Sequence, residues 1–333
     1  MAAIRPTDPM PGDPSAQPLL GLLGPTASGK SELGAALARS LGLEVLSLDS
    51  MLVYSGLDIG TAKPSPESRA RVPHHLIDVA DPRQRFDVSR YLELAQAAER
   101  DLAARGRRGL YVGGTAFYLR ALTHGLFEGP PHDPELRARL ELRAAEQGLP
   151  ALHAELARID PESARRLHAN DRKRVLRALE VFEQSGRPLS DWQRQWRLAG
   201  AEPPGRPRLL LGLEPPDLEG RFRPRVEAML RAGWLAEVAA LEAQGAFGPT
   251  ASMALGYPLA RAHLAGRLAL HELIERTALA TRQFARSQRT WLRRYPEIRW
   301  APASCYPAGR GDPQALLAWA EGQLRPWLEQ PAG

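Results

Sequence analysis

The chain has 333 residues, and its 44% hydrophobic and 25% charged residues are typical of globular proteins; at about 150 residues per domain, this length predicts roughly two domains. The single cysteine, Cys305, excludes a disulfide framework and a zinc site built from cysteines, and no apolar run approaches the ~20 residues that a membrane span needs. Lysine and arginine total 44 against 38 acidic residues, a net charge of +6, and only three of these cations are lysines. We expect the position of each cation, rather than the total, to indicate function.

The amino-terminal part of the chain predicts an alternation of strands and helices. Residues 1–17 are polar and rich in proline, without the pattern of a signal peptide, and we expect them to be disordered. Strands are expected at residues 19–23, 44–48 and 109–112, and helices at 30–40, 88–105 and 115–123. Short apolar strands that alternate with helices are typical of an α/β fold with a parallel sheet flanked by helices.

The middle of the chain differs, because residues 127–196 show almost only helical patterns, interrupted by turns that contain proline and glycine. This predicts an all-helical insertion at 127–204 between two parts of the α/β core, 18–126 and 205–325. In the second part we expect a strand at 208–213 and helices at 218–231, 235–244 and 270–294.

A glycine-rich segment directly after the first predicted strand matches the P-loop pattern G-x-x-x-x-G-K-[ST]. Its backbone N–H groups and the amino end of the following helix favour anions, and its lysine adds a full positive charge. The core is therefore expected to be P-loop NTPase-like. We predict that a di- or triphosphate binds at Gly24, Thr26, Ala27, Ser28, Gly29, Lys30 and Ser31, with the Ser31 hydroxyl as a ligand of Mg²⁺.

Asp49 directly follows the second predicted strand. The carboxyl ends of strands face the ligand crevice in sheets of this kind, so we expect Asp49 near the phosphate site, as a metal ligand through water or as a general base. The alternative is that Asp49 only caps a turn with Ser50. The strand at 109–112 ends in Gly113-Gly114-Thr115, not in the acid usual in nucleotide-hydrolysing P-loop proteins.

Two groups of cations predict contacts with RNA phosphates. Arg282, Arg286, Arg289 and Arg293 recur on one face of a predicted helix, and the nearest carboxylates in sequence, Glu272 and Glu275, lie at least a turn earlier. The alternative for this stripe is an ordinary charged face. The second group lies in the predicted insertion, in a segment whose one acidic residue is Asp171. Its members are Arg165, Arg166, Arg172, Lys173, Arg174 and Arg177.

The segment Asp49–Pro64, which contains Gly-Leu-Asp-Ile-Gly-Thr-Ala-Lys-Pro, together with the P-loop strongly resembles the tRNA dimethylallyltransferases, also called tRNA isopentenyltransferases. Residues 73–78, 112–115, 177–181, 280–283 and 291–293 agree with the same family, and the resemblance covers about residues 18–303. It implies transfer of a dimethylallyl group from dimethylallyl diphosphate to N6 of the adenosine at tRNA position 37, 3′-adjacent to the anticodon.

The resemblance also implies roles for individual residues. Asp49 would be the general base, Thr115 would position the base and the diphosphate, and Arg225 would contact the diphosphate. From the residues alone, Arg225 shares one face of a predicted helix with Arg221, and a solvated surface is an equal alternative for this pair. The expected contacts with tRNA are Asp49, Ser50, Met51, Leu52, Lys173, Arg174, Arg177, Gly256, Tyr257, Arg282 and Arg286. Leu52, Ser55 and the segment 253–258 depart from the residues usual in the family, which weakens the expectation there.

Two other activities stay open at this stage. The P-loop alone favours an ATP-dependent small-molecule kinase, and a related isopentenyltransferase would act on free AMP, ADP or ATP. The insertion and the arginine groups favour tRNA, because a free nucleotide needs no clamp formed from two parts of the chain. The resemblance implies that the part of the tRNA that is bound is the anticodon stem-loop. We expect Mg²⁺ as the cofactor, no membrane association, a monomer and a cytoplasmic location.

Overall fold

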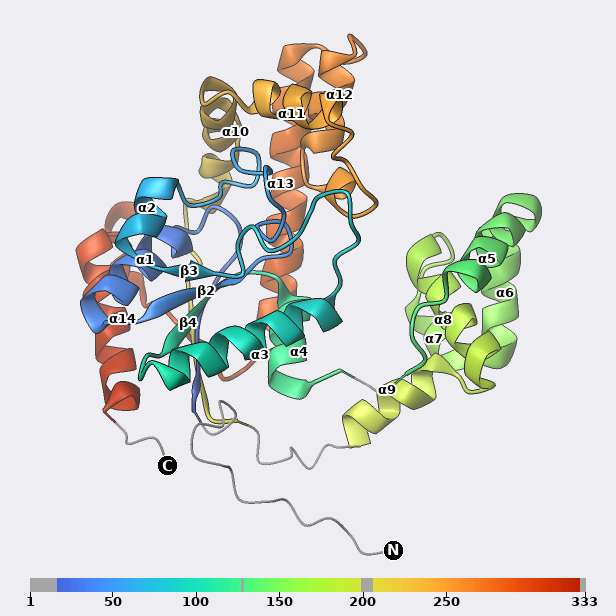
Figure 1. Ribbon diagram of the computed structural model, residues 1–333, viewed down its shortest axis with the longest axis horizontal. Coiled ribbons are helices and arrows are strands. Elements are labelled where there is room, and N and C mark those ends of the chain that lie inside the picture. Colours follow the sequence, from blue (N-terminus) through green and yellow to red (C-terminus); the bar gives the residue numbers. More distant parts are fainter. Residues whose placement is uncertain (1–16, 127–128, 199–205, 330–333) are drawn as a thin grey trace, which may run out of the picture. The chain divides into compact units, whose positions relative to one another are not determined.

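The computed structural model describes residues 17–126, 129–198 and 206–329 (Figure 1). The chain divides into two compact units: residues 1–123 with 206–333, here called the core, and residues 124–205, here called the insertion. The sequence predicted an insertion at 127–204. The predicted disorder at 1–17 falls, except for Gln17, outside the described residues.

A six-stranded sheet forms the centre of the core, with the strand order β3-β2-β4-β1-β5-β6 and parallel pairing throughout. Its strands are β1 (Leu19–Leu23), β2 (Glu44–Leu48), β3 (His74–His75), β4 (Gly109–Gly113), β5 (Arg208–Gly212) and β6 (Arg299–Trp300). All residues of β1 and β2 are buried, as expected for parallel strands with both faces covered. The predicted parallel α/β fold is therefore confirmed, with two additional two-residue edge strands.

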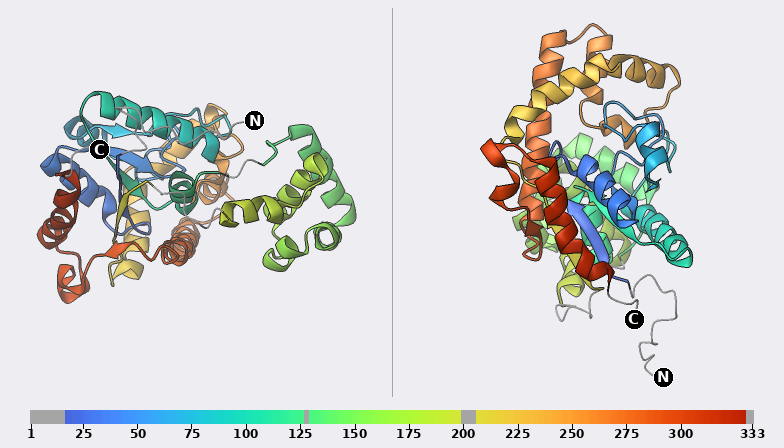
Figure 2. Two further views of the ribbon diagram at one scale, coloured as in Figure 1. Left: turned by 90° about the horizontal axis from the view of Figure 1, so that it is seen from below. Right: turned by 90° about the vertical axis from the view of Figure 1, so that its left-hand side faces the viewer.

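Helices cover both faces of this sheet (Figures 1 and 2). Alternate residues of β1 point to opposite faces, so Leu19 and Leu23 belong to one hydrophobic cluster while Leu20 and Leu22 belong to another. The first cluster includes side chains of α3, α4 and α13, and the second includes those of α1 and α14. The core helices are α1 (Lys30–Leu41), α2 (Pro66–Arg71), α3 (Val88–Ala104), α4 (Ala116–His124), α10 (Phe222–Arg231), α11 (Trp234–Ala243), α12 (Tyr257–Leu264), α13 (Leu270–Leu292) and α14 (Pro313–Leu328).

The insertion has a hydrophobic core of its own. Leucines and valines of three helices, including Leu140, Leu152 and Leu179, are fully buried in it. The described part of the insertion is all-helical, with α5 (Pro134–Gln147), α6 (Leu149–Ile159), α7 (Pro161–Arg166), α8 (Arg172–Ser185) and α9 (Leu189–Leu198). A separate buried cluster explains why this segment forms a compact unit without strands.

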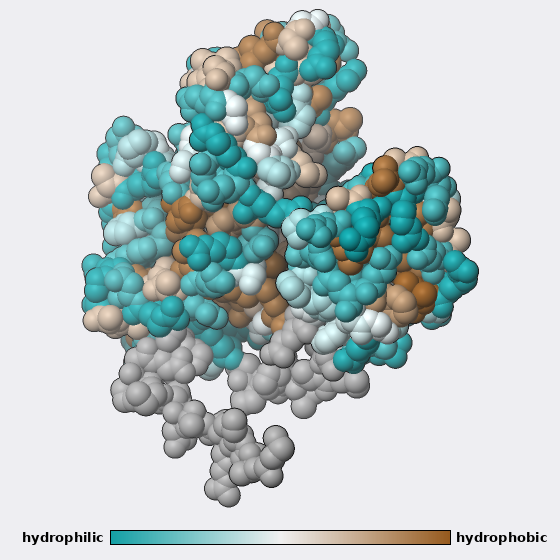
Figure 3. All heavy atoms as spheres, turned by 45° about the vertical axis from the view of Figure 1, so that its right-hand side comes forward, coloured by the Kyte–Doolittle hydropathy of each residue, from teal (hydrophilic) through white to brown (hydrophobic). Residues whose placement is uncertain are grey.

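The surface is mainly hydrophilic, as expected for a chain with the composition of a globular protein. On the face that Figure 3 shows, hydrophilic side chains predominate and apolar ones form small patches. None of the helices in the described ranges is long and apolar enough to cross a membrane.

Candidate functional site

The P-loop connects β1 to α1, and some of its hydrogen-bond donors have no acceptor within the described residues. Ala27 and Gly29 adopt positive φ angles of 64° and 87°, and within the described residues neither amide has an acceptor. The Ser28 hydroxyl is buried and has no partner there either. A loop of this shape at the start of a helix favours an anion, which supplies the missing acceptors.

Two cations flank this loop. Burial lowers the pKa of Lys30 to about 8, although the nearby Asp49 carboxylate opposes the shift, and the Lys30 ammonium donates to the carbonyl of Pro25 (3.2 Å). Burial also lowers the pKa of Arg225, from α10, against the opposing charges of Glu32 and Asp49. Neither cation has a carboxylate within 4.0 Å in the described part of the chain. Desolvated cations without a salt-bridge partner are costly, and a bound anion would relieve that cost.

Asp49 lies at the carboxyl end of β2, where its side chain shapes a turn. Its Oδ1 accepts the amides of Met51 (2.8 Å) and Leu52 (3.3 Å), whereas Oδ2 has no donor among the residues described. Asp49 therefore does cap a turn, but this contact does not prevent its carboxylate from acting as a general base or a metal ligand. The two amides fix the carboxylate and leave one oxygen available.

The end of β4 lies between the P-loop strand and the Asp49 strand, because β4 pairs with both β1 and β2. Thr115 Oγ1 accepts the amide of Ser50 (3.2 Å), which places Thr115 beside Asp49. A Cβ on Gly113 would lie 2.1 Å from the carbonyl of Leu48, and one on Gly114 would lie 2.5 Å from the carbonyl of Gly24. The two glycines therefore allow three loops to meet, in the position where many P-loop proteins carry an acid.

The segment that carries the family resemblance is held by a buried lysine. Lys63, with a side chain only 1% exposed, forms salt bridges with Asp58 and Asp78 (2.5 Å each) and donates to the carbonyl of Tyr54. These contacts stabilise the conformation of the 49–64 segment, so Lys63 has a structural role in this loop. The motif alone did not reveal this role.

A carboxylate from α11 holds the same segment, and the sequence reasoning missed it. The amides of Asp58, Ile59 and Gly60 all donate to Glu237, at 2.9, 2.6 and 3.2 Å. The hydroxyl of Tyr257 donates to Glu237 as well (2.6 Å). Glu237 is 177 to 179 residues from its amide partners, and no local pattern signals such a contact.

Gly256 and Tyr257, expected at the tRNA surface, lie inside the core. Tyr257 is 0% exposed, and its hydroxyl is occupied by Glu237. Gly256 is buried with a φ of 86°, and a Cβ there would lie 2.7 Å from the Trp234 ring. The structure therefore gives both residues a packing role and leaves neither open to a tRNA phosphate.

The α13 arginines are not free of carboxylates, so that part of the sequence argument is wrong. Arg289 and Arg293 both pair with Glu214 (2.5 and 3.0 Å), and Arg282 pairs with Glu219 (3.0 Å). These carboxylates come from the segment before α10, far from α13 in sequence. Arg286 is exposed and has no salt bridge within the described ranges.

The insertion arginines are likewise opposed by more than Asp171. Arg172 pairs with Glu141 (2.5 Å), and Arg177 pairs with the fully buried Glu180 (3.2 Å) and donates to the carbonyl of Pro130 (2.6 Å). Arg174 is exposed and pairs with Asp171 (3.1 Å). Lys173 is exposed, and no partner contacts its ammonium in the part of the chain described.

The predicted helix at 218–231 begins with a 3₁₀ turn at Leu218–Arg221, which runs directly into α10. Arg221 and Arg225 both lie beside the P-loop. Arg221 pairs with Asp217 (2.7 Å) and donates to the carbonyl of Ala27 (3.2 Å). It therefore braces the P-loop, while Arg225 stays available.

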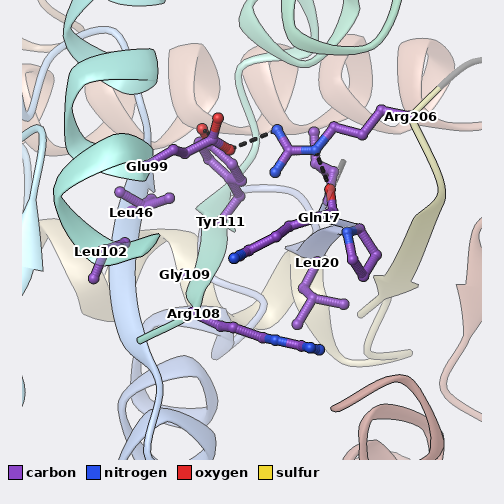
Figure 4. Close-up of a pocket in the computed structure, with 11 residues that line it drawn as sticks. Gln17, Leu20, Leu46, Glu99, Leu102, Arg108, Gly109, Tyr111 and Arg206 are labelled. Atoms are coloured by element: carbon purple, nitrogen blue, oxygen red, sulfur yellow. Dashed lines mark hydrogen bonds and ion pairs between the residues drawn. The ribbon is translucent and has the colours of Figure 1, made fainter. Parts of the chain in front are cut away.

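A small pocket that is not a candidate site lies at the opposite end of the strands from the P-loop (Figure 4). It has a volume of about 10 Å³, room for roughly one water molecule. Glu99 accepts hydrogen bonds from Arg206 (2.7 Å) and from the hydroxyl of Tyr111 (2.9 Å), which fixes the chain where it returns from the insertion. Leu20 and Gly109 place the pocket at the amino ends of β1 and β4, away from the P-loop.

Comparisons with known proteins agree with this geometry. A family profile described as IPP transferase matches residues 52–295, and one described as Isopentenyl transferase matches residues 18–74. The chain is 49% identical to a tRNA dimethylallyltransferase of Methylococcus capsulatus, over 85% of this chain and 91% of that protein. It is 45% identical to one of Anaeromyxobacter dehalogenans, over 91% and 99%.

Solved structures point the same way. The tRNA isopentenylpyrophosphate transferase of Bacillus halodurans matches with a TM-score of 0.63 and 32% identity, over 94% of this chain and 98% of that one. A eukaryotic dimethylallyltransferase acting on tRNA matches with a TM-score of 0.68 and 27% identity, over 83% and 70%. These relatives support neither a small-molecule kinase nor an enzyme that prenylates free adenylate.

Proposed function

The chain belongs to the tRNA dimethylallyltransferase family, and from this premise we propose which residues carry the transfer of a dimethylallyl group from its diphosphate to N6 of the adenosine beside the tRNA anticodon. One observation supports the assignment most strongly. Lys30 and Arg225, both desolvated and without salt bridges in the described residues, flank the P-loop donors beside Asp49, namely the Ala27 and Gly29 amides and the Ser28 hydroxyl, here called the cradle. A diphosphate supplies the negative charge and the acceptor oxygens that complement these cations and donors.

Stabilisation of the leaving group is the task of the cradle. The bond between the allylic carbon and the diphosphate oxygen breaks, and its electron pair leaves with the diphosphate. The P-loop amides, Lys30 and Arg225 are arranged where that negative charge grows, and preorganised charges of this kind supply a large share of catalysis. Arg221 holds the loop through the carbonyl of Ala27.

Proton removal is the task of Asp49. The N6 nitrogen forms the new bond to the allylic carbon and releases one proton, which passes to Asp49 Oδ2. The amides of Met51 and Leu52 hold the other oxygen, and Thr115 joins the base to the end of β4 through the amide of Ser50. A positioned general base contributes typically about 10²–10⁴-fold.

Mg²⁺ is the proposed metal, with the Ser31 hydroxyl as its ligand from the protein. The described residues contain no group of three or more histidine, cysteine or acidic side chains that could hold an ion. This fits Mg²⁺, which commonly takes one or two protein ligands and completes its shell with substrate phosphates and water. When bound, the ion would neutralise charge on the diphosphate.

The macromolecular partner is the anticodon stem-loop of tRNA. Its loop bases are already unpaired, which lowers the free-energy cost of flipping one of them out of the stack. We assign backbone contacts to the exposed cations Lys173 and Arg286, and assign Arg174, Arg177 and Arg282 a smaller share because carboxylates engage them. Ser50, Met51 and Leu52, partly exposed beside Asp49, would contact the target nucleotide. We further propose that the chain acts as a monomer in the cytoplasm, where this substrate is found.

The test mixes the purified full-length chain with unmodified tRNA, Mg²⁺ and dimethylallyl diphosphate labelled in its allylic group. We expect label in tRNA. Asp49→Asn keeps an oxygen for the Met51 and Leu52 amides but removes the base, so the transfer rate should fall by about 10²–10⁴-fold while tRNA affinity stays near that of the wild type. Full activity of this variant would reject the base assignment, and label in free AMP or ATP instead of tRNA would reject the substrate.

A further inference from the structure

A glutamine lies in the buried stripe of α13. Thr277, Thr281, Ala285, Gln288 and Leu292 face the core along this helix, and Gln288 is only 5% exposed. A polar side chain in such a position is costly unless both ends of its amide are hydrogen-bonded. Its contacts therefore explain why a glutamine is tolerated there.

Both ends of the amide are bonded, and to two different loops. Gln288 Oε1 accepts the amide of Thr26 in the P-loop (2.8 Å), and Nε2 donates to the carbonyl of Gly114 at the end of β4 (3.0 Å). These partners fix the orientation of the side-chain amide, because a backbone N–H needs an acceptor and a carbonyl needs a donor. Glutamate cannot donate when ionised, and leucine can do neither.

The backbone at Gly114 packs closely against both the Gln288 side chain and the P-loop. A Cβ on Gly114 would lie 2.4 Å from Gln288 Nε2 and 2.5 Å from the carbonyl of Gly24. The residue after Gly114 is Thr115, whose hydroxyl binds the amide of Ser50 beside Asp49. One side chain thus joins the diphosphate cradle to the segment that holds the proposed base.

We propose that Gln288 is a positioning residue that fixes the distance between the diphosphate cradle and the Asp49–Thr115 pair. This inference rests on the proposed function. The reacting carbon is attached to the diphosphate, while the proton acceptor belongs to β2, so a shift between the P-loop and the end of β4 misaligns the reaction. A misplacement of about 1 Å can reduce a rate about 10²-fold.

The first test compares Gln288→Leu with Gln96→Leu, a matched change of an exposed glutamine on α3. For Gln288→Leu we expect the kcat of prenyl transfer to fall by about 10- to 100-fold, with the Kd for tRNA within about twofold of the wild type. Gln96→Leu should retain wild-type values. If the wild type itself transfers no label, the proposed function has failed; if the wild type is active and Gln288→Leu matches it, only this inference has failed.

The second test uses Gln288→Glu and separates positioning from general loss of structure. Protonated glutamate offers one O–H donor and one acceptor, as glutamine does, whereas ionised glutamate offers no donor. The activity of Gln288→Glu relative to the wild type at the same pH should therefore rise as the pH falls from 8 to 6. The same ratio for Gln288→Leu should stay constant.

The outcomes are distinct even if one variant folds poorly. A ratio for Gln288→Glu that does not change with pH would overturn the proposal, and this measurement does not depend on Gln288→Leu. A loss of tRNA affinity as large as the loss of kcat in Gln288→Leu would also overturn it, because it would indicate a general defect.

Discussion

Two regions of the molecule use their cations differently: the P-loop region of the core and helix α8 of the insertion. In the core, Lys30 and Arg225 are desolvated beside the P-loop without a salt-bridge partner among the described residues. In the insertion, Arg172 and Arg177 pair with Glu141 and Glu180, which belong to the same unit. A partly buried charge without a salt-bridge partner is costly, and a bound anion would offset that cost, whereas a paired charge needs no further explanation.

This contrast shows why counting arginines predicts little. The helical stripe on α13 resembles an RNA-binding face in sequence, yet Arg282, Arg289 and Arg293 all have carboxylate partners in the fold. We propose that the cations that act on a ligand are those without a carboxylate within 4.0 Å among the described residues. The three predictions below test that distinction, beginning with the largest expected effect.

The largest effect is expected at Arg225. Arg225→Ala removes a charge at the leaving group, and kcat should fall by about 10²–10³-fold, about 2.7–4 kcal/mol of transition-state stabilisation. Arg223→Ala is the matched control, because Arg223 lies on the same helix, is exposed and pairs with Glu227 and Glu275. Steady-state label transfer measures both variants. Equal losses of kcat in the two variants would contradict the proposed difference between unpaired and paired cations.

A tenfold effect is expected from the ionisation of Lys30. Because burial lowers the pKa of this lysine to about 8, it carries its charge below that pH and loses it above. The Kd for dimethylallyl diphosphate should therefore increase by about tenfold for each pH unit above 8. Lys30→Arg keeps its charge throughout and should show no such rise. Equilibrium binding between pH 7 and 9.5 gives the answer, and a constant wild-type Kd would contradict it.

The smallest effect is expected in the insertion, where Lys173 has no salt bridge within the described residues while its α8 neighbours Arg172, Arg174 and Arg177 each have one. Lys173→Ala should weaken tRNA binding by a few-fold and reduce the slope of log K against log salt by about 0.7, the value for one single-strand phosphate. Arg194→Ala, which removes a cation paired with Glu162 and Asp191, is the control and should leave the slope unchanged. Filter binding over a range of salt concentrations measures both slopes. An unchanged slope for Lys173→Ala would remove this residue from the proposed interface.

The sequence predicted the central elements well because their signals are local. The strands at 19–23 and 44–48 coincide with β1 and β2, since short, mainly apolar segments bounded by turn signals favour buried strands. The P-loop pattern likewise locates the end of β1 and the start of α1. The edge strands β3 and β6, of two residues each, and the helices α12 and α14 were not anticipated.

The site could be predicted only in part, because much of it depends on long-range contacts. Gln288 bonds to Thr26 across 262 positions, and Glu237 bonds to Asp58 across 179. Tyr257 is an aromatic residue in a segment that resembles a tRNA contact, yet the fold uses its hydroxyl for Glu237. Such roles follow from which loops the sheet brings together, and no spacing along the chain encodes them.

The most direct test of the account is a crystal structure of the chain with Mg²⁺ and a non-reactive dimethylallyl thiolodiphosphate. We predict that the diphosphate accepts hydrogen bonds from the P-loop amides, that Arg225 approaches it within about 2.7–3.2 Å, and that the allylic carbon faces Asp49 Oδ2. A diphosphate bound elsewhere, or an Arg225 side chain turned away to pair with Glu32, would contradict the account.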